Sequence, residues 1–248
     1  FRQEFKADIT DYFEADGNYH LKLNKNAFYS EGGGQPADQG TIGASNISHV
    51  YEKAGEIFHI ADRLPAEKSG LNCKLNWERR FDLMQKHSGQ HLLSAVAEDL
   101  YQARTVGFHL EESSLTIDTD TQLSQPEIKK IELKCNQLIY ENRDISVEYP
   151  DSQGDTRIVK IARLAGNPCG GTHLNSTGQI GIISIISSEN YKAGSRLHFV
   201  CGERAVKDYS FKNELIAFLR ERLSVNDQNV KAEITRLLDE LDNKSKII

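Results

Sequence analysis

Two short motifs, far apart in the sequence, carry side chains that commonly bind metal ions. The first is HSGQH, with His87 and His91, and the second is CGGTH, with Cys169 and His173. Residues four apart on a helix share one face, so the first two imidazoles can point at one ion. Two glycines leave the backbone of the second motif free to bring its thiolate and imidazole together. Three imidazoles and one thiolate suit tetrahedral zinc, so we predict a zinc site formed by these four residues.

Each motif is weak evidence by itself, because an isolated histidine pair is more often a polar helix face than half of a metal site. Two pairs in one chain strengthen the prediction, since either pair alone would leave an ion under-coordinated. Catalytic zinc sites usually have three protein ligands and one open position. With four candidates, the sequence leaves open whether the ion activates water, polarises a carbonyl or orients the substrate.

A third motif, FYSEGGGQP at 28–36, contains Gly32, Gly33, Gly34 and Gln35. Successive glycines allow the backbone to approach a ligand closely, so we expect their N–H groups to hold a phosphate or a terminal adenosine. No Gly-Lys-Ser/Thr follows, which excludes the phosphate loop of nucleotide hydrolases. The alternative interpretation is a tight turn between two strands.

The elements that position these motifs follow from hydrophobic periodicity. Residues 19–24 and 71–75 alternate as strands do, and Lys53-Ala54-Gly55 indicates a hairpin. Residues 78–100 predict a helix whose apolar face is formed by Gly89, Leu92, Leu93, Val96 and Leu100. Ser124 caps a second helix, with an early Pro126. Further strands are expected at 113–118, 145–149, 157–161, 180–187 and 196–201, of which 180–186 is the longest apolar stretch and predicts a buried strand.

These elements predict an α+β fold in three parts. Residues 1–76 form a small β-barrel-like domain with the glycine motif, and residues 77–202 form a mainly antiparallel sheet with helices that carry the zinc site. Residues 203–248 form a helical extension in which a stripe repeats at near-heptad spacing, as at the start of a coiled coil. The stripe consists of Val230, Ile234, Leu237, Leu238 and Leu241. One short helix cannot bury it, so we expect packing on the domain or a homodimer through these helices.

The composition fits a globular protein of 248 residues with 38% apolar residues. No run of about 18 apolar residues and no signal peptide is present, so we expect neither a membrane span nor export. The spacing of the four cysteines offers no disulfide framework, which favours the cytoplasm, and three are expected to be buried: Cys73, Cys135 and Cys201. The chain begins at Phe1 and stops within the helical pattern, so we expect a longer protein.

A net charge of −6 argues against a global field that attracts nucleic acid. RNA binding would require a local patch, because the phosphate backbone dominates affinity. The candidates are Arg79, Arg80, Lys86, Arg104, Lys192 and Arg196. The alternative is that each is an ordinary solvated surface charge.

The three motifs, in this order, resemble the stand-alone alanyl-tRNA editing proteins of the AlaX family and the editing domain of alanyl-tRNA synthetases. The resemblance covers nearly the whole chain and includes NWERR at 76–80, directly before the first histidine motif. It implies an ATP-independent hydrolase that cleaves the ester of tRNA(Ala) wrongly charged with serine or glycine and spares Ala-tRNA(Ala). A synthetase pocket built for alanine rejects these amino acids poorly, which explains the need for a second site. DNA and membranes are not expected partners.

The resemblance also implies residue roles. Thr105 matches the position that recognises the seryl hydroxyl, because its own hydroxyl can donate and accept. Thr105 and Gln90 are the candidate catalytic residues. The candidate substrate-binding residues are Gly32, Gly33, Gly34, Gln35, Gly107, Arg79 and Arg80.

Three other functions compete with this one. The chain is alternatively the excised editing domain of an alanyl-tRNA synthetase, which would perform the same reaction. A zinc-stabilised RNA-binding module without catalysis is a different class. A metalloprotease is disfavoured, because HSGQH lacks the glutamate base of HExxH.

Overall fold

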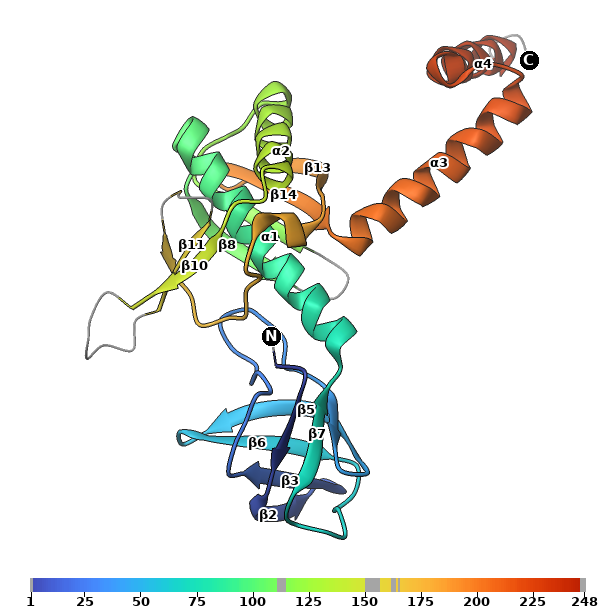
Figure 1. The fold of residues 1–248 in the computed structure, drawn as a ribbon. Coiled ribbons are helices and arrows are strands. Elements are labelled where there is room, and N and C mark those ends of the chain that lie inside the picture. The colour runs from blue at the N-terminus through green and yellow to red at the C-terminus, as the bar shows by residue number, and fades with distance from the viewer. Residues whose placement is uncertain (1, 111–114, 150–156, 162–163, 165, 246–248) are drawn as a thin grey trace. The chain divides into compact units, whose positions relative to one another are not determined.

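The computed structural model describes residues 2–110, 115–149, 157–161, 164 and 166–245 (Figure 1). Contacts divide the chain into two compact units, residues 1–202 and 203–248. The fold is α+β, as the sequence predicts. The further division of the first unit at residue 76 stays a prediction, although two separate hydrophobic clusters lie on either side of it.

The N-terminal part is a curled seven-stranded antiparallel sheet with the order β1-β7-β4-β5-β6-β3-β2. Its strands are β1 (Glu4–Ala7), β2 (Ile9–Ala15), β3 (Asn18–Leu23), β4 (Gly40–Ile42), β5 (Ser45–Lys53), β6 (Glu56–Ala61) and β7 (Leu71–Leu75). The predicted hairpin joins β5 to β6, where Ala54 and Gly55 both have positive φ. Two such residues give the turn whose twist matches that of the paired strands.

A long helix, α1 (Trp77–Tyr101), follows β7 directly and carries the first histidine motif. Asn76 caps it by accepting a hydrogen bond from Arg79 N. Four residues of the predicted apolar face are buried, and Leu100 is 40% exposed. Burial is not confined to that face, because every residue from 83 to 97 is buried. The helix packs on α2, β8, β9, β11, β14 and η1, so its middle turns are covered on all sides.

A four-stranded antiparallel sheet, in the order β13-β14-β9-β8, lies beside α1. Its strands are β8 (Thr105–Leu110), β9 (Leu115–Thr119), β13 (Ile183–Tyr191) and β14 (Gly194–Cys201). A smaller sheet contains β10 (Ile145–Glu148), β11 (Ile158–Ile161) and β12 (Asn167–Pro168). The strand expected at 113–118 is β9, and residues 113–114 lie outside the described residues.

The buried strand expected at 180–186 is wrong in two respects. Ile180 ends a 3-10 helix, η1 (Thr177–Ile180), and Gly181 breaks the chain direction before β13 begins. β13 is an edge strand and is not fully buried: Ile186 within it is 46% exposed, and Ile182 just before it is 41% exposed.

The helix α2 (Gln125–Tyr140) agrees with its predicted start. Ser124 and Glu127 form a capping box, and Pro126 lies in the first turn. Cys135 lies within its buried face, and Cys73 and Cys201 are buried in strands, as expected.

The C-terminal unit contains α3 (Glu203–Leu223), a 3-10 turn η2 (Asp227–Asn229) and α4 (Val230–Ser245). The Asn226 side chain caps the turn by accepting a hydrogen bond from Asn229 N. Of the predicted stripe, Val230 is buried, whereas Leu238 and Leu241 are 57% and 63% exposed. Dimerisation through this stripe stays a prediction. No helix in the described part of the chain is long and apolar enough to cross a membrane.

Candidate metal centre

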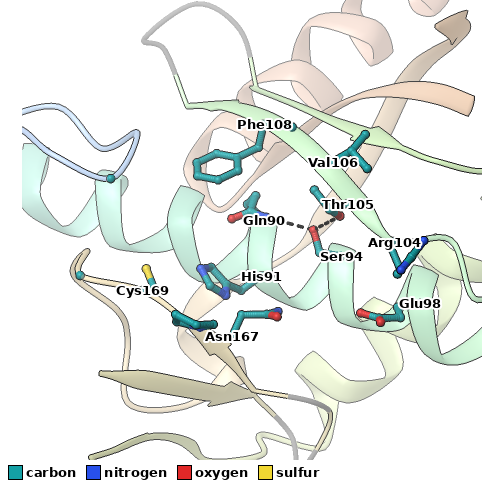
Figure 2. A pocket seen from close by; sticks show the side chains of 14 residues that line it. Gln90, His91, Ser94, Glu98, Arg104, Thr105, Val106, Phe108, Asn167 and Cys169 are labelled. Atoms are coloured by element: carbon teal, nitrogen blue, oxygen red, sulfur yellow. Dashed lines mark hydrogen bonds between the residues drawn. The ribbon is translucent and has the colours of Figure 1, made fainter. Parts of the chain in front are cut away.

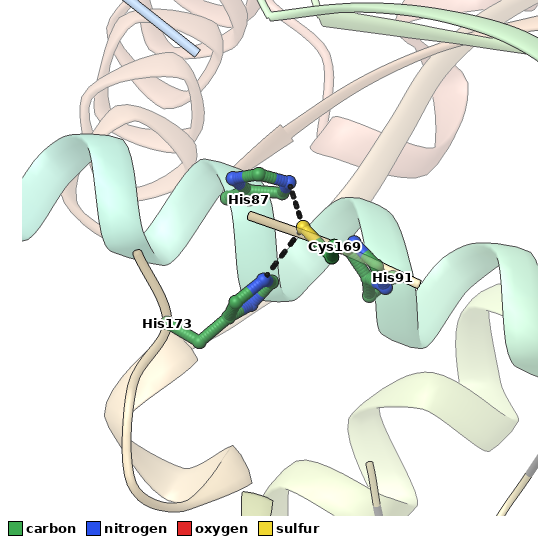
Figure 3. Close-up of side chains that lie close together, drawn as sticks. All are labelled: His87, His91, Cys169 and His173. Carbon is green, nitrogen blue, oxygen red and sulfur yellow. Dashed lines mark hydrogen bonds between the residues drawn. The ribbon is translucent and has the colours of Figure 1, made fainter. Parts of the chain in front are cut away.

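The two motifs meet in space, although 82 residues separate His87 from Cys169 (Figure 3). α1 supplies His87 and His91, and the loop after β12 supplies Cys169 and His173. One ligand atom from each residue lies within 4.8 Å of all the others, and Cys169 Sγ is 3.2 Å from Nε2 of both His87 and His173. Zinc bonds of about 2.0–2.3 Å in a tetrahedron keep ligand atoms roughly 3.5 Å apart, so this cluster fits a zinc ion. The four residues thus form a site that can bind a metal ion.

Gln35 of the glycine motif is hydrogen-bonded to His87, one of the four residues of the cluster. Its side chain is 1% exposed, and Oε1 accepts from His87 Nδ1 at 2.8 Å and from Thr172 N at 2.9 Å. Because an amide oxygen can only accept, His87 Nδ1 must carry the proton, which leaves the Nε2 lone pair directed at Cys169. Gln35 was predicted to contact substrate. Its contact with His87 places it to orient a potential metal ligand, and substrate contact by Gln35 stays a prediction.

Ser88 has the corresponding place beside His173. Its Oγ lies 3.3 Å from His173 Nδ1 and accepts a hydrogen bond from Leu174 N at 3.0 Å. Sequence reasoning missed Ser88, although it lies inside the first motif. The motif itself could have indicated a role for Ser88, since polar residues close to a metal ligand often orient that ligand.

The guanidinium of Arg157 lies close to the cluster and fixes the second motif. It donates to the carbonyl oxygens of Cys169, at 3.3 Å, and of Gly171. Burial, with a contribution from Arg157, lowers the pKa of His87 to about 3 and that of His91 to about 4, and lowers the pKa of His173 as well. Burial raises the pKa of the Cys169 thiol. The imidazoles are therefore neutral and ready to coordinate near pH 7, while the thiol must lose its proton.

A cavity of about 610 Å³ opens beside the cluster (Figure 2). His91, Cys169 and Gly170 line one part of it. Four residues of the remaining wall were predicted for the site: Gly33, Gln90, Thr105 and Gly107. Four others were not predicted from the sequence: Ser94, Glu98, Phe108 and Asn167. Gly32, Gly34 and Gln35 line a neighbouring cavity of about 300 Å³ on the other side of Phe108.

Comparisons with known proteins agree with these motifs. Residues 156–197 match the family model described as "Threonyl and Alanyl tRNA synthetase second additional domain". The alanyl-tRNA editing protein AlaX-L of Pyrococcus horikoshii is 33% identical over 87% of this chain and 59% of that protein. Aarsd1 of Danio rerio, also called an alanyl-tRNA editing protein, is 30% identical over 82% of this chain and 55% of its own length. Over most of its length, this chain is similar to alanyl-tRNA editing proteins.

A much longer enzyme also matches this chain. An alanine–tRNA ligase of Methanopyrus kandleri is 28% identical over the whole chain, which corresponds to 30% of the ligase. The chain spans little more than half the length of the editing proteins it matches. What those whole proteins do is therefore carried to this chain only as a proposal.

Most of the basic side chains predicted to form a local RNA-binding patch have partners within the protein. Arg80, Lys86, Arg104 and Arg196 each pair with an aspartate. Arg80 is only 9% exposed, its Nε donates to Asp38, and its Nη2 donates to Ala27 O and to Asp38. Arg79 Nε donates to Ala37 O at 3.2 Å. Arg80 was predicted to contact substrate, but it lies in a buried ion pair with Asp38. We therefore do not retain it as a substrate contact.

Replacement of Gln35 by leucine is expected to weaken zinc binding about 10- to 100-fold. Without the amide oxygen, His87 loses the partner that fixes its tautomer and ring orientation. Competition with a chromophoric chelator measures the affinity. Gln39→Leu is the matched control, because Gln39 lies four residues away and its Nε2 donates to Ser48 O, outside the metal-binding cluster. Equal affinities for Gln35→Leu and Gln39→Leu would contradict the orienting role.

Zinc binding near pH 7 is expected to release about one proton. The neutral histidines have none to lose, whereas the raised pKa of Cys169 keeps its thiol protonated. Affinity should therefore rise with pH, by roughly tenfold per unit between pH 6 and 8. Calorimetry in two buffers of different ionisation enthalpy counts the protons. Release of two or more protons would mean that the histidines are charged in the free protein.

Proposed function

We propose that this chain hydrolyses the ester of tRNA(Ala) carrying serine or glycine and leaves Ala-tRNA(Ala) intact. The observation that carries the proposal is the cavity that connects the metal-binding cluster to Gln90 and Thr105. Its volume suits one aminoacyl-adenosine, the end of a charged tRNA. The names of the relatives, alanyl-tRNA editing proteins and alanine–tRNA ligases, supply the substrate class.

Zinc is the metal that the donor set favours, and when bound it would supply Lewis-acid polarisation of the ester carbonyl or an activated water. The chain's own residues do the rest. Gln35 and Ser88 orient His87 and His173, and Arg157 holds the loop that carries Cys169. Phe108 provides an apolar wall of the cavity and helps to exclude water from the ester.

The preference for serine over alanine must be polar, because alanine is smaller than serine and cannot be excluded by size. Thr105 opens β8 and lies in the cavity wall, where its Oγ1 donates to Ser94 Oγ at 2.6 Å. The hydroxyls of Thr105 and Ser94 offer the seryl hydroxyl a hydrogen-bond partner, whereas alanine has no hydroxyl to pair with them. We place the reaction in the cytoplasm, where charged tRNA is used.

The test is deacylation of Ser-, Gly- and Ala-tRNA(Ala) by the metal-loaded chain. Serine and glycine esters should be lost about 100-fold faster than in buffer, or more, and the alanine ester at the buffer rate. A chelator should abolish the acceleration. Binding of tRNA without turnover of any ester would overturn the proposal and favour a zinc-stabilised RNA-binding module.

A further inference from the structure

The amide of Gln90 lies in the cavity wall with only one of its two ends hydrogen-bonded. The side chain is 4% exposed, and Nε2 donates to Ser94 Oγ at 2.9 Å. Oε1 is buried and has no hydrogen-bond partner among the residues that the structure describes. Buried carbonyl oxygens in native proteins are almost always paired, so this acceptor is suited to a donor that arrives with a ligand.

Ser94 determines which end of the amide is presented. Its Oγ receives two hydrogen bonds, one from Gln90 Nε2 and one from Thr105 Oγ1. With the donor end of Gln90 committed to Ser94, the carbonyl oxygen turns away from that serine (Figure 2). The Thr105 hydroxyl is hydrogen-bonded to the same Ser94 oxygen at 2.6 Å, so Thr105 and Gln90 share this partner.

The charges around the cavity favour a neutral donor over an ammonium group. Arg157 brings a positive charge to the loop of Cys169 and Gly170, which lines the same cavity. A metal ion on the cluster would add to this charge. The carboxylate in the wall, Glu98, lies two helical turns from Gln90 and beside Arg104 (Figure 2). A cation next to Gln90 would therefore face like charges in a partly dry site, whereas a hydroxyl would not.

We propose that Gln90 Oε1 accepts a hydrogen bond from the side-chain hydroxyl of the seryl ester, and that Ser94 is the positioning residue that presents this oxygen. The inference rests on the proposed function for its ligand. Alanyl and glycyl groups have no side-chain donor, so they leave Oε1 buried and unpaired. Serine is thereby preferred by hydrogen bonding and not by size.

Binding of stable analogues tests this inference separately from catalysis. The probes are seryl, alanyl and glycyl amides of 3′-amino-3′-deoxyadenosine, in which nitrogen replaces the ester oxygen and prevents hydrolysis. Wild type should bind the seryl amide most tightly. Gln90→Met keeps the side-chain length but removes the acceptor, and should weaken only the seryl amide, by about 2- to 13-fold. Gln137→Met on the exposed face of α2 is the matched control. Zinc content and Tm of each variant report on the fold.

Ser94→Ala should weaken the seryl amide in the wild-type background and have little further effect in the Gln90→Met background, because it acts through Gln90. Equal weakening of all three amides, no change in any, or a wild type without preference for serine would each overturn the inference. If the preference depends on Gln90 but no ester is hydrolysed, the proposed function fails and the inference stands. If esters are hydrolysed while Gln90→Met keeps the preference, the reverse holds.

Discussion

Replacement of Cys169 by alanine is expected to abolish metal binding and, with it, the proposed deacylase activity. The substitution leaves three imidazoles from the four-membered cluster. Structural zinc sites bind with roughly 10–16 kcal/mol in total, so one of four ligands is worth about 3 kcal/mol, or roughly 100-fold in affinity. Metal analysis after dialysis against a weak chelator measures the loss.

Cys73→Ala is the control for this experiment. Cys73 is a buried free thiol in β7, in the hydrophobic cluster of the N-terminal sheet, and is not part of the metal-binding group. It should keep one zinc per chain even if its Tm falls. Full zinc content in Cys169→Ala would mean that the thiolate is not a ligand.

Replacement of Gly171 by alanine is expected to disrupt the metal centre, whereas the same change at Gly170 should leave metal binding intact. A Cβ at position 171 would lie 2.0 Å from His87 Cε1, 2.3 Å from His87 Nδ1 and 3.0 Å from Gln35 Oε1. A Cβ at position 170 would meet nothing within 4 Å. Neither glycine has a positive φ, so the difference between the two variants is purely steric.

The displaced His87 would lose both its hydrogen bond to Gln35 and its place among the ligands. We expect zinc affinity to fall about 10- to 100-fold or more in Gly171→Ala, and to change less than about twofold in Gly170→Ala. The comparison uses metal affinity, because Gly170 lines the cavity and its alanine variant can affect substrate. Equal affinities in the two variants would show that the loop relaxes away from His87.

The metal-binding residues could be predicted from the sequence because each pair is local. The spacing of His87 and His91 places them on one helix face, and the second motif is equally short. The capping box at Ser124 and the hairpin turn at Gly55 are local for the same reason. Their chemistry depends on residues a few positions apart, which a sequence displays directly.

Only the tertiary structure decided which residues support and surround the metal centre. Gln35 reaches His87 across 52 positions, and Arg80 reaches Asp38 across 42. Nothing in either residue's neighbourhood in the sequence indicates these partners. The burial of α1 on every side also depends on elements that follow it in the chain. Hydrogen-bond partners and burial are set by which surfaces pack together. The sequence therefore could not show that Gln35 contacts a potential metal ligand or that Arg80 forms a buried ion pair.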